Sequence, residues 1–156
     1  MTHDAFRIPP APLALTVAGL APFMGSAAAR LLLDADPIRA AQTELVLIAY
    51  AAVILSFLGG VRWGVEMTDA SLSEPRWGVM IGSVLGALAG WGLVLYAVLG
   101  TRSPWIFLGA AALLVMHWLW DMSMKPAPAW YSGLRLLATA GAAGSLILVW
   151  GWVLFG

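Results

Sequence analysis

Apolar residues in this chain come in long unbroken stretches rather than in the alternating pattern of a half-buried β-strand. A helix needs about 20 apolar residues to cross a hydrocarbon core roughly 30 Å thick. Five stretches approach or exceed that length, at residues 13–33, 45–65, 78–99, 105–122 and 134–155. The continuous runs also argue against a membrane β-barrel. We therefore predict an all-α fold, a polytopic membrane protein whose five transmembrane helices form one bundle.

The connections between these stretches are short and hold turn-forming and charged residues. The first is expected to be about eleven residues long, from Asp34 to Glu44, and the fourth is a proline-rich turn at residues 125–128. The spans leave no room for a soluble domain, so we predict a single transmembrane domain over residues 1–156.

Composition supports the lipid bilayer as the solvent and excludes several functions. Of 156 residues, 62% are hydrophobic and 10% charged, and the mean hydropathy is +0.89. A soluble domain averages about a quarter charged residues. Eight basic and eight acidic residues cancel, which leaves no polybasic surface for nucleic acid. Without cysteine, disulfides, cysteine-ligated metals and thiol catalysis are excluded.

The chain is predicted to lie in a bacterial inner (plasma) membrane. Its first apolar stretch, followed by small residues at 26–29, resembles a secretory signal. Gly19 and Pro22 interrupt that stretch, so we expect it to remain as the first span. The segment before the first span lies on the same side of the membrane as the second and fourth connections. Basic residues on this side outnumber those near the first and third connections by five to three. The positive-inside rule then places the N-terminus in the cytoplasm and the C-terminus outside. The five are Arg7, Arg62, Arg76, Lys125 and Arg135, and the three are Arg30, Arg39 and Arg102.

Small residues at helical spacing indicate where the spans pack. Lipid supplies no hydrophobic drive between helices, so close contacts depend on glycine and other small residues. Glycine recurs every fourth residue in the third span, and the second span has a comparable group. These predicted packing residues are Gly78, Gly82, Gly86 and Gly90, with Gly59, Gly60 and Gly64. We favour contacts within the bundle; the alternative is a surface for another subunit or a second copy of the chain.

Charged residues inside a membrane are costly, so each is expected to have a partner or a purpose. Arg62 and Glu66 lie one helical turn apart, as do His117 and Asp121, and these spacings place each pair on one helix face. Glu66 is expected to pair with Arg62 or with another nearby cation. The turn after Asp121 is short, so Arg135 on the next span can reach it.

Topology gathers these residues toward one membrane face. The second and fourth spans end where the fifth begins, so their polar residues and the neighbouring aromatic rings are expected to lie together. The candidate binding residues are Arg62, Trp63, Glu66, His117, Asp121, Trp130 and Arg135, with Tyr131 beside them. Two interpretations remain open: helix-end anchors that snorkel to the interface, or a site for a ligand or partner.

Several motifs resemble a known family. They are residues 19–23 (Gly-Leu-Ala-Pro-Phe), 56–64 (Ser-Phe-Leu-Gly-Gly-Val-Arg-Trp-Gly) and 128–131 (Pro-Ala-Trp-Tyr), together with the Leu-Arg pair at 134–135. The chain is similar over nearly its whole length to domain-of-unknown-function family 3429, the transmembrane protein 69-like proteins. The Phe-Leu-Gly-Gly segment that runs into Trp-Gly is the most specific part. This resemblance implies a small multi-spanning membrane protein and supplies no reaction.

No catalytic set accompanies the polar residues. Walker loops, His-Glu-x-x-His and nucleophile elbows do not occur in the sequence, and we expect neither an enzyme nor a metal site. The preferred hypothesis is a non-catalytic accessory, assembly or stabilising factor for a membrane complex, with no resident cofactor. The alternative is a protein that binds a lipid or a quinone at the one-sided polar cluster.

Overall fold

The structure, a computed structural model, describes residues 7–100, 102–124 and 128–156. These residues form five α-helices and no β-strand, and each helix is long and apolar enough to cross a membrane. The helices are α1 (Pro10–Leu32), α2 (Pro37–Met67), α3 (Trp77–Leu99), α4 (Trp105–Ser123) and α5 (Ala129–Phe155). The predicted fold class is therefore confirmed. Lys125, one of the five basic residues counted for orientation, lies outside the described residues.

Local capping explains where α2 begins, and it shortens the first connection from its predicted length. The Asp36 carboxylate accepts hydrogen bonds from the backbone N–H groups of Ile38 and Arg39, both at 3.1 Å. Pro37 occupies the first helical position, where a missing N–H costs nothing. These two residues start the helix at Pro37, so the polar segment up to Glu44 is helical rather than a loop.

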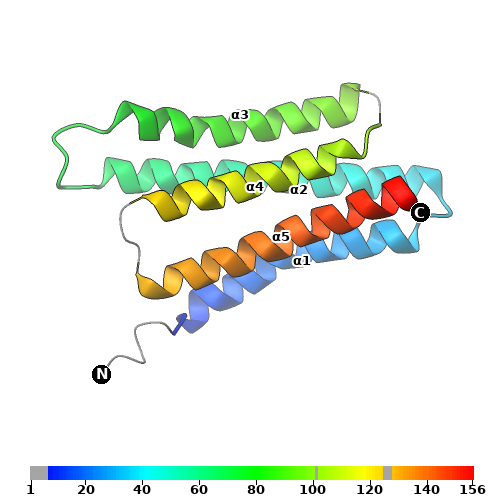
Figure 1. The fold of residues 1–156 in the computed structure, drawn as a ribbon, viewed down its shortest axis with the longest axis horizontal. Coiled ribbons are helices and arrows are strands. Elements are labelled where there is room, and N and C mark those ends of the chain that lie inside the picture. Colours follow the sequence, from blue (N-terminus) through cyan, green and yellow to red (C-terminus); the bar gives the residue numbers. More distant parts are fainter. Residues whose placement is uncertain (1–6, 101, 125–127) are drawn as a thin grey trace.

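The five helices run antiparallel along the chain, so every second helix end lies at the same end of the bundle (Figure 1). The C-terminal ends of α2 and α4 lie together with the N-terminal ends of α1, α3 and α5 on the left of Figure 1. We call this end the leader end. The other end holds the turn between α1 and α2 and the C-terminal end of α5.

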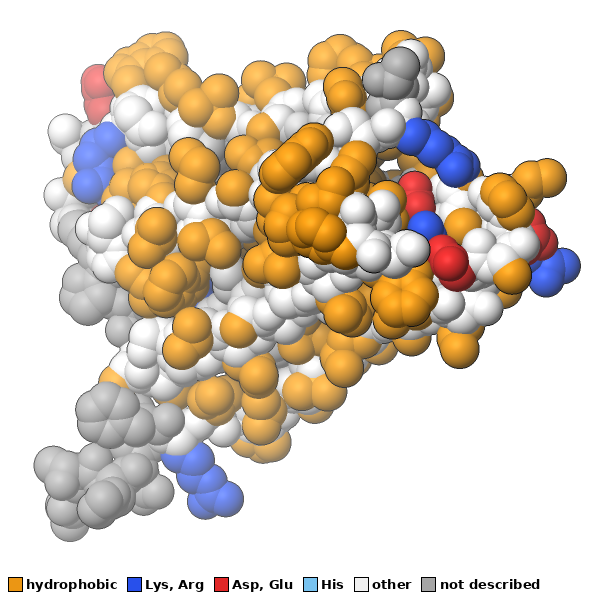
Figure 2. Space-filling view, turned by 45° about the vertical axis from the view of Figure 1, so that its right-hand side comes forward, with side chains coloured by type: hydrophobic (Ala, Val, Ile, Leu, Met, Phe, Trp, Pro, Cys, Tyr) orange, Lys and Arg blue, Asp and Glu red, His pale blue; other side chains and the backbone are white. Residues whose placement is uncertain are grey.

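The core is apolar, and so is most of the outer surface. Phe23, Leu47, Leu55 and Leu146 are among the fully buried side chains that join α1, α2 and α5. Figure 2 shows hydrophobic side chains covering the middle of the visible face, with charged side chains toward its two sides. A band of apolar surface between two charged ends is what a bilayer-spanning bundle needs.

The closest helix contact joins α2 to α3 through small residues. A Cβ placed on Gly59 would lie 2.1 Å from the carbonyl oxygen of Ser83, and one on Gly90 would lie 2.9 Å from the Cα of Ala52. Between these two positions, a Cβ placed on Gly86 would lie 3.0 Å from the carbonyl oxygen of Leu55. Three contacts in antiparallel register mean that the two backbones touch along about two helical turns.

The predicted packing role holds for only part of the glycine set. Gly82 also packs closely, because a Cβ placed on it would lie 2.9 Å from the Trp120 ring of α4. A Cβ added at Gly60, Gly64 or Gly78 would meet no heavy atom of the described residues within 4 Å, so these three glycines do not take part in the helix contacts that the structure describes. Gly60 follows Gly59 by one residue, which turns it about 100° away from α3, and Gly64 lies one turn further on the same outward face.

The end opposite the leader end has its own charge cluster. Arg30 donates to Glu44 and to Asp34, both at 2.6 Å, which ties α1 to α2. The Trp152 ring N–H reaches the Asp34 carboxylate at 3.2 Å and adds α5. Two hydrogen bonds hold the pKa of Asp34 below its ordinary value. The bond from Arg30 has the larger effect and the bond from Trp152 the smaller.

Candidate functional site

Asp121 is the centre of the polar cluster at the leader end. Its carboxylate accepts a hydrogen bond from Nε of Arg62 on α2 and another, at 2.7 Å, from Nε of Arg135 on α5. Nη2 of Arg62 also donates to the Asp121 carbonyl oxygen at 2.6 Å. One carboxylate thus joins α2, α4 and α5. Asp121 and Arg135 are 5% and 6% exposed, so this is a buried cluster rather than a pair of snorkelling chains.

His117 and Trp120 complete the side of the cluster that faces α3. Nδ1 of His117 lies 3.8 Å from the Asp121 carboxylate, and both of its ring nitrogens are buried without a hydrogen-bond partner among the described residues. The His117 ring packs edge-on against Trp120, with 5.3 Å between centroids. The Arg62 guanidinium lies 5.9 Å from the centroid of the same Trp120 ring, within the range of a cation–π contact.

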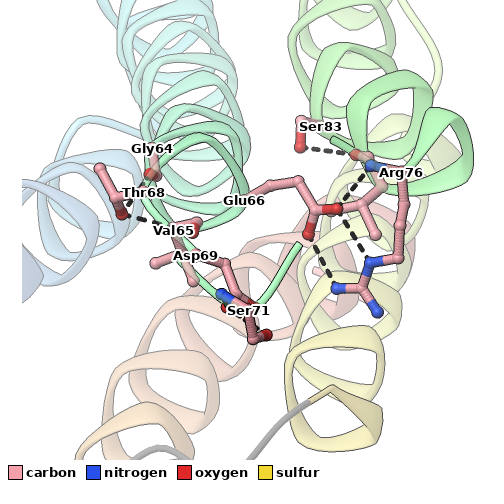
Figure 3. Close-up of polar contacts among 9 residues, drawn as sticks. Gly64, Val65, Glu66, Thr68, Asp69, Ser71, Arg76 and Ser83 are labelled. Carbon is pink, nitrogen blue, oxygen red and sulfur yellow. Dashed lines mark hydrogen bonds and ion pairs between the residues drawn. The ribbon is translucent and has the colours of Figure 1, made fainter. Parts of the chain in front are cut away.

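Glu66 does not pair with Arg62. It faces α3, where Arg76 precedes the first helical residue and binds it through two nitrogens, at 2.9 and 2.8 Å (Figure 3). The backbone N–H of Arg76 donates to the same carboxylate at 2.7 Å. The sequence allowed Glu66 to pair either with Arg62 or with another nearby cation. The structure shows the second arrangement, with Arg76 as the partner. The hydrogen bonds with Glu66 raise the pKa of Arg76 above its ordinary value. The pair links the end of α2 to the start of α3.

The three predicted aromatic residues have different positions. Tyr131 lies next to the cluster and lines the cavity described below together with Asp121 and Arg135. Trp130 is half-buried and packs edge-on against the Tyr131 ring, with 6.2 Å between centroids. Trp63 is 43% exposed and lines a shallow outer groove with Trp77. Trp63 is therefore not part of the cluster, because its side chain points to the lipid side of α2.

An apolar cavity of about 360 Å³ adjoins the cluster. Side chains of α1, α2, α4 and α5 form its wall. The cavity exists because α5 packs on α1 and α4 but barely touches α2. Its apolar wall includes Leu15, Phe23, Phe57, Leu58, Leu114 and Ala142, and its polar end consists of Asp121, Tyr131 and Arg135.

The long dimension of the cavity lies along the bundle. Its lining on α1 extends from Pro12 to Phe23 and its lining on α5 from Tyr131 to Ala142. Eleven helical steps at 1.5 Å each correspond to about 16 Å, which is about half of a hydrocarbon core roughly 30 Å thick. The cavity therefore has the depth of one leaflet, with its charged end at the membrane face.

Sequence reasoning missed three features of the site: the roles of Trp120 and Arg76, and the cavity. Trp120 fits an ordinary aromatic belt at a span end, and Arg76 fits a connection between spans. The cavity depends on how α2 and α5 diverge in three dimensions, which no local pattern records. A signal for Arg76 does exist, since a residue directly before a helix and ten positions after a buried acid can turn back onto it.

Together, the fold and the cluster define a class: a polytopic membrane protein of five transmembrane helices with a buried, charged site at one end. The chain belongs to the family of proteins of unknown function DUF3429, which matches residues 8–151. It is also 32% identical over 141 residues to transmembrane protein 69 of Xenopus tropicalis, covering 86% of this chain and 51% of that protein. The chain thus spans about half the length of this relative. No solved structure matches the chain.

Proposed function

We propose that the protein is a non-catalytic binder of one membrane-dissolved amphiphile, held in the cavity between α1, α2, α4 and α5. The single observation that carries this proposal is the position of Arg135, which with Asp121 and Tyr131 forms the polar end of a cavity whose remaining wall is mostly apolar. Ligand sites are typically concave and apolar, with a few polar groups that fix orientation. Snorkelling anchors, the alternative interpretation of the cluster, are supported less well because Arg135 and Asp121 are buried.

An accessory or assembly role in a membrane complex, or self-association, is the other candidate, and the structure supports it less well. Its motivation is the glycine stripe of the third span. Gly82, Gly86 and Gly90 are occupied by α2 and α4 of the same chain, so they offer no groove to a partner's helix. Of the predicted packing glycines, the outward-facing Gly60, Gly64 and Gly78 have open space beside them.

We further propose a bacterial inner membrane location with the leader end on the cytoplasmic side. The support is the excess of basic residues at the leader end, since cytoplasmic ends of spans carry more arginine and lysine. Arg62 and Arg135 lie in the buried cluster, so they contribute less to this excess than exposed residues would. With this orientation the cavity takes its ligand from the cytoplasmic leaflet.

Filling the cavity tests the proposed function. Ala138 lines the cavity, whereas Ala140 is exposed on another face of the same helix. Because an added ring takes up the space for a chain, Ala138→Phe is expected to remove a stoichiometric amphiphile that mass spectrometry detects in protein purified with a mild detergent. The matched variant Ala140→Phe is expected to keep it.

Size-exclusion chromatography shows whether both variants remain folded. An equal lipid content in wild type, Ala138→Phe and Ala140→Phe would mean that only surface lipid is bound, and the proposed function would be wrong.

A further inference from the structure

The charges that meet at Asp121 do not cancel among the described residues. Arg62 and Arg135 both donate to Asp121, so two cations share one carboxylate. His117 adds no negative charge in either protonation state. Glu66 is matched by Arg76, and that pair lines a second pocket, which Arg62 and Asp69 also border. At the Asp121 carboxylate itself, one positive charge is left over, and an uncompensated charge is costly in a buried site.

The uncompensated charge has an unused donor next to the cavity. Arg135 gives its Nε–H to Asp121, while its Nη2 is buried and has no hydrogen-bond partner among the described residues. Arg135 is 6% exposed and lines the cavity. A buried donor of a charged group that lacks an acceptor costs more than a neutral one. No described residue supplies this acceptor, and Arg135 borders the cavity, so a ligand headgroup there is in place to supply it.

We infer that the ligand is a single-chain amphiphile with an anionic headgroup, a long-chain fatty acid, whose carboxylate binds Arg135. This inference rests on the proposed function and adds the chemical class of the ligand. A carboxylate supplies both the negative charge and the oxygen acceptors that a guanidinium prefers. A quinone carbonyl supplies an acceptor without the charge, so it leaves the cation uncompensated.

The dimensions of the cavity favour one hydrocarbon chain. Its volume of about 360 Å³ lies at the small end of the range of roughly 300–1,000 Å³ for ligand sites. Its depth of about 16 Å, from the helical rise, matches a chain that lies within one leaflet. Phe57 and Leu15 are exposed at its wall, so the chain enters sideways from the lipid.

The test compares two ligands that differ only in headgroup. Wild-type protein in phosphatidylcholine nanodiscs is titrated with palmitate and with 1-hexadecanol, and occupancy is measured by native mass spectrometry. Palmitate is expected to bind at least about tenfold more tightly, because a hydrogen bond to a charged group contributes about 1.5–3 kcal/mol. Arg135→Gln should reduce this preference to less than about threefold, chiefly by weakening the binding of palmitate.

Two further variants serve as controls. Arg39→Gln removes an exposed arginine at the opposite end and is expected to keep the wild-type preference for palmitate. Arg135→Lys keeps the positive charge and is expected to keep part of the preference for palmitate over 1-hexadecanol. If Arg135→Gln does not fold, the palmitate-to-hexadecanol ratio of the wild-type protein still decides the headgroup.

The outcomes separate the inference from the proposed function. Equal affinity for palmitate, 1-hexadecanol and decylubiquinone would overturn the anionic headgroup but leave an amphiphile site in place. Displacement of palmitate by phosphatidylglycerol in the nanodiscs would overturn the single chain. If none of these ligands binds and Ala138→Phe loses nothing on purification, both proposals fail.

Discussion

Asp121→Asn is expected to destabilise the folded protein by about 3–5 kcal/mol, the usual cost of removing one partner from a buried ion pair. The carboxylate is the only described group that Arg62 and Arg135 share, so its loss leaves two buried cations without an anion. Native proteins are stable by only about 5–15 kcal/mol. Thermal unfolding in detergent, followed by fluorescence-detected size exclusion, should therefore show a large fall in Tm or no folded peak.

A matched control and a double variant sharpen this test. Glu74→Gln removes an exposed carboxylate at the same end of the bundle and is expected to leave Tm nearly unchanged. Adding Arg135→Gln to Asp121→Asn removes one of the stranded cations, so the double variant should lose less stability than the sum of its single variants. An Asp121→Asn protein that melts like Glu74→Gln would show that the cluster contributes nothing to the fold.

The sequence predicts the spans well because the length of an apolar run is a local property. It also predicts the Asp121–Arg135 pair, since a short connection makes α4 and α5 antiparallel neighbours. The same reasoning gives the i,i+4 pair of His117 and Asp121, whose side chains approach to 3.8 Å. Each of these predictions needs only helix geometry and the order of the spans.

Contacts that depend on the rotation of one helix about its axis are not predictable in this way. Spacing alone allows Arg62 to pair with Glu66 because both lie on one face of α2, but the structure directs Arg62 to α4 and Glu66 to α3. The two side chains extend from that face toward different helices, where Asp121 and Arg76 are their partners. Tertiary packing, not spacing, decides between such partners.

The same limit explains the glycines and the cavity. Glycine at every fourth position predicts a packing face on α3, and Gly82, Gly86 and Gly90 do pack. Gly78 fits the same pattern but has open space beside it, because the pattern does not record where the neighbouring helix ends its contact. The cavity is a gap between α2 and α5, which are far apart in sequence, and no residue pattern marks a gap.

Gly59→Ala is expected to destabilise the bundle strongly, whereas the neighbouring Gly60→Ala should be neutral or stabilising. The Cβ that Gly59→Ala introduces would lie 2.1 Å from the Ser83 carbonyl oxygen and 3.2 Å from its carbonyl carbon. These are backbone atoms of α3, so α2 and α3 must separate along their whole contact. Overpacking of this kind costs about 1–3 kcal/mol and occasionally more, and here it also loosens Gly86 and Gly90 from α2.

Gly60 provides the control within the same sequence. A Cβ at Gly60 would meet no atom within 4 Å in the part of the chain that the structure describes, and an interior helical glycine is about 1 kcal/mol less favourable than alanine. The two adjacent alanine variants should therefore shift Tm in opposite directions when both are unfolded in the same detergent. Equal Tm values would contradict the tight α2–α3 contact. The close approach of α2 and α3 also explains why Glu66, near the end of α2, lies beside Arg76 at the start of α3. Equal Tm values would leave that ion pair without this explanation.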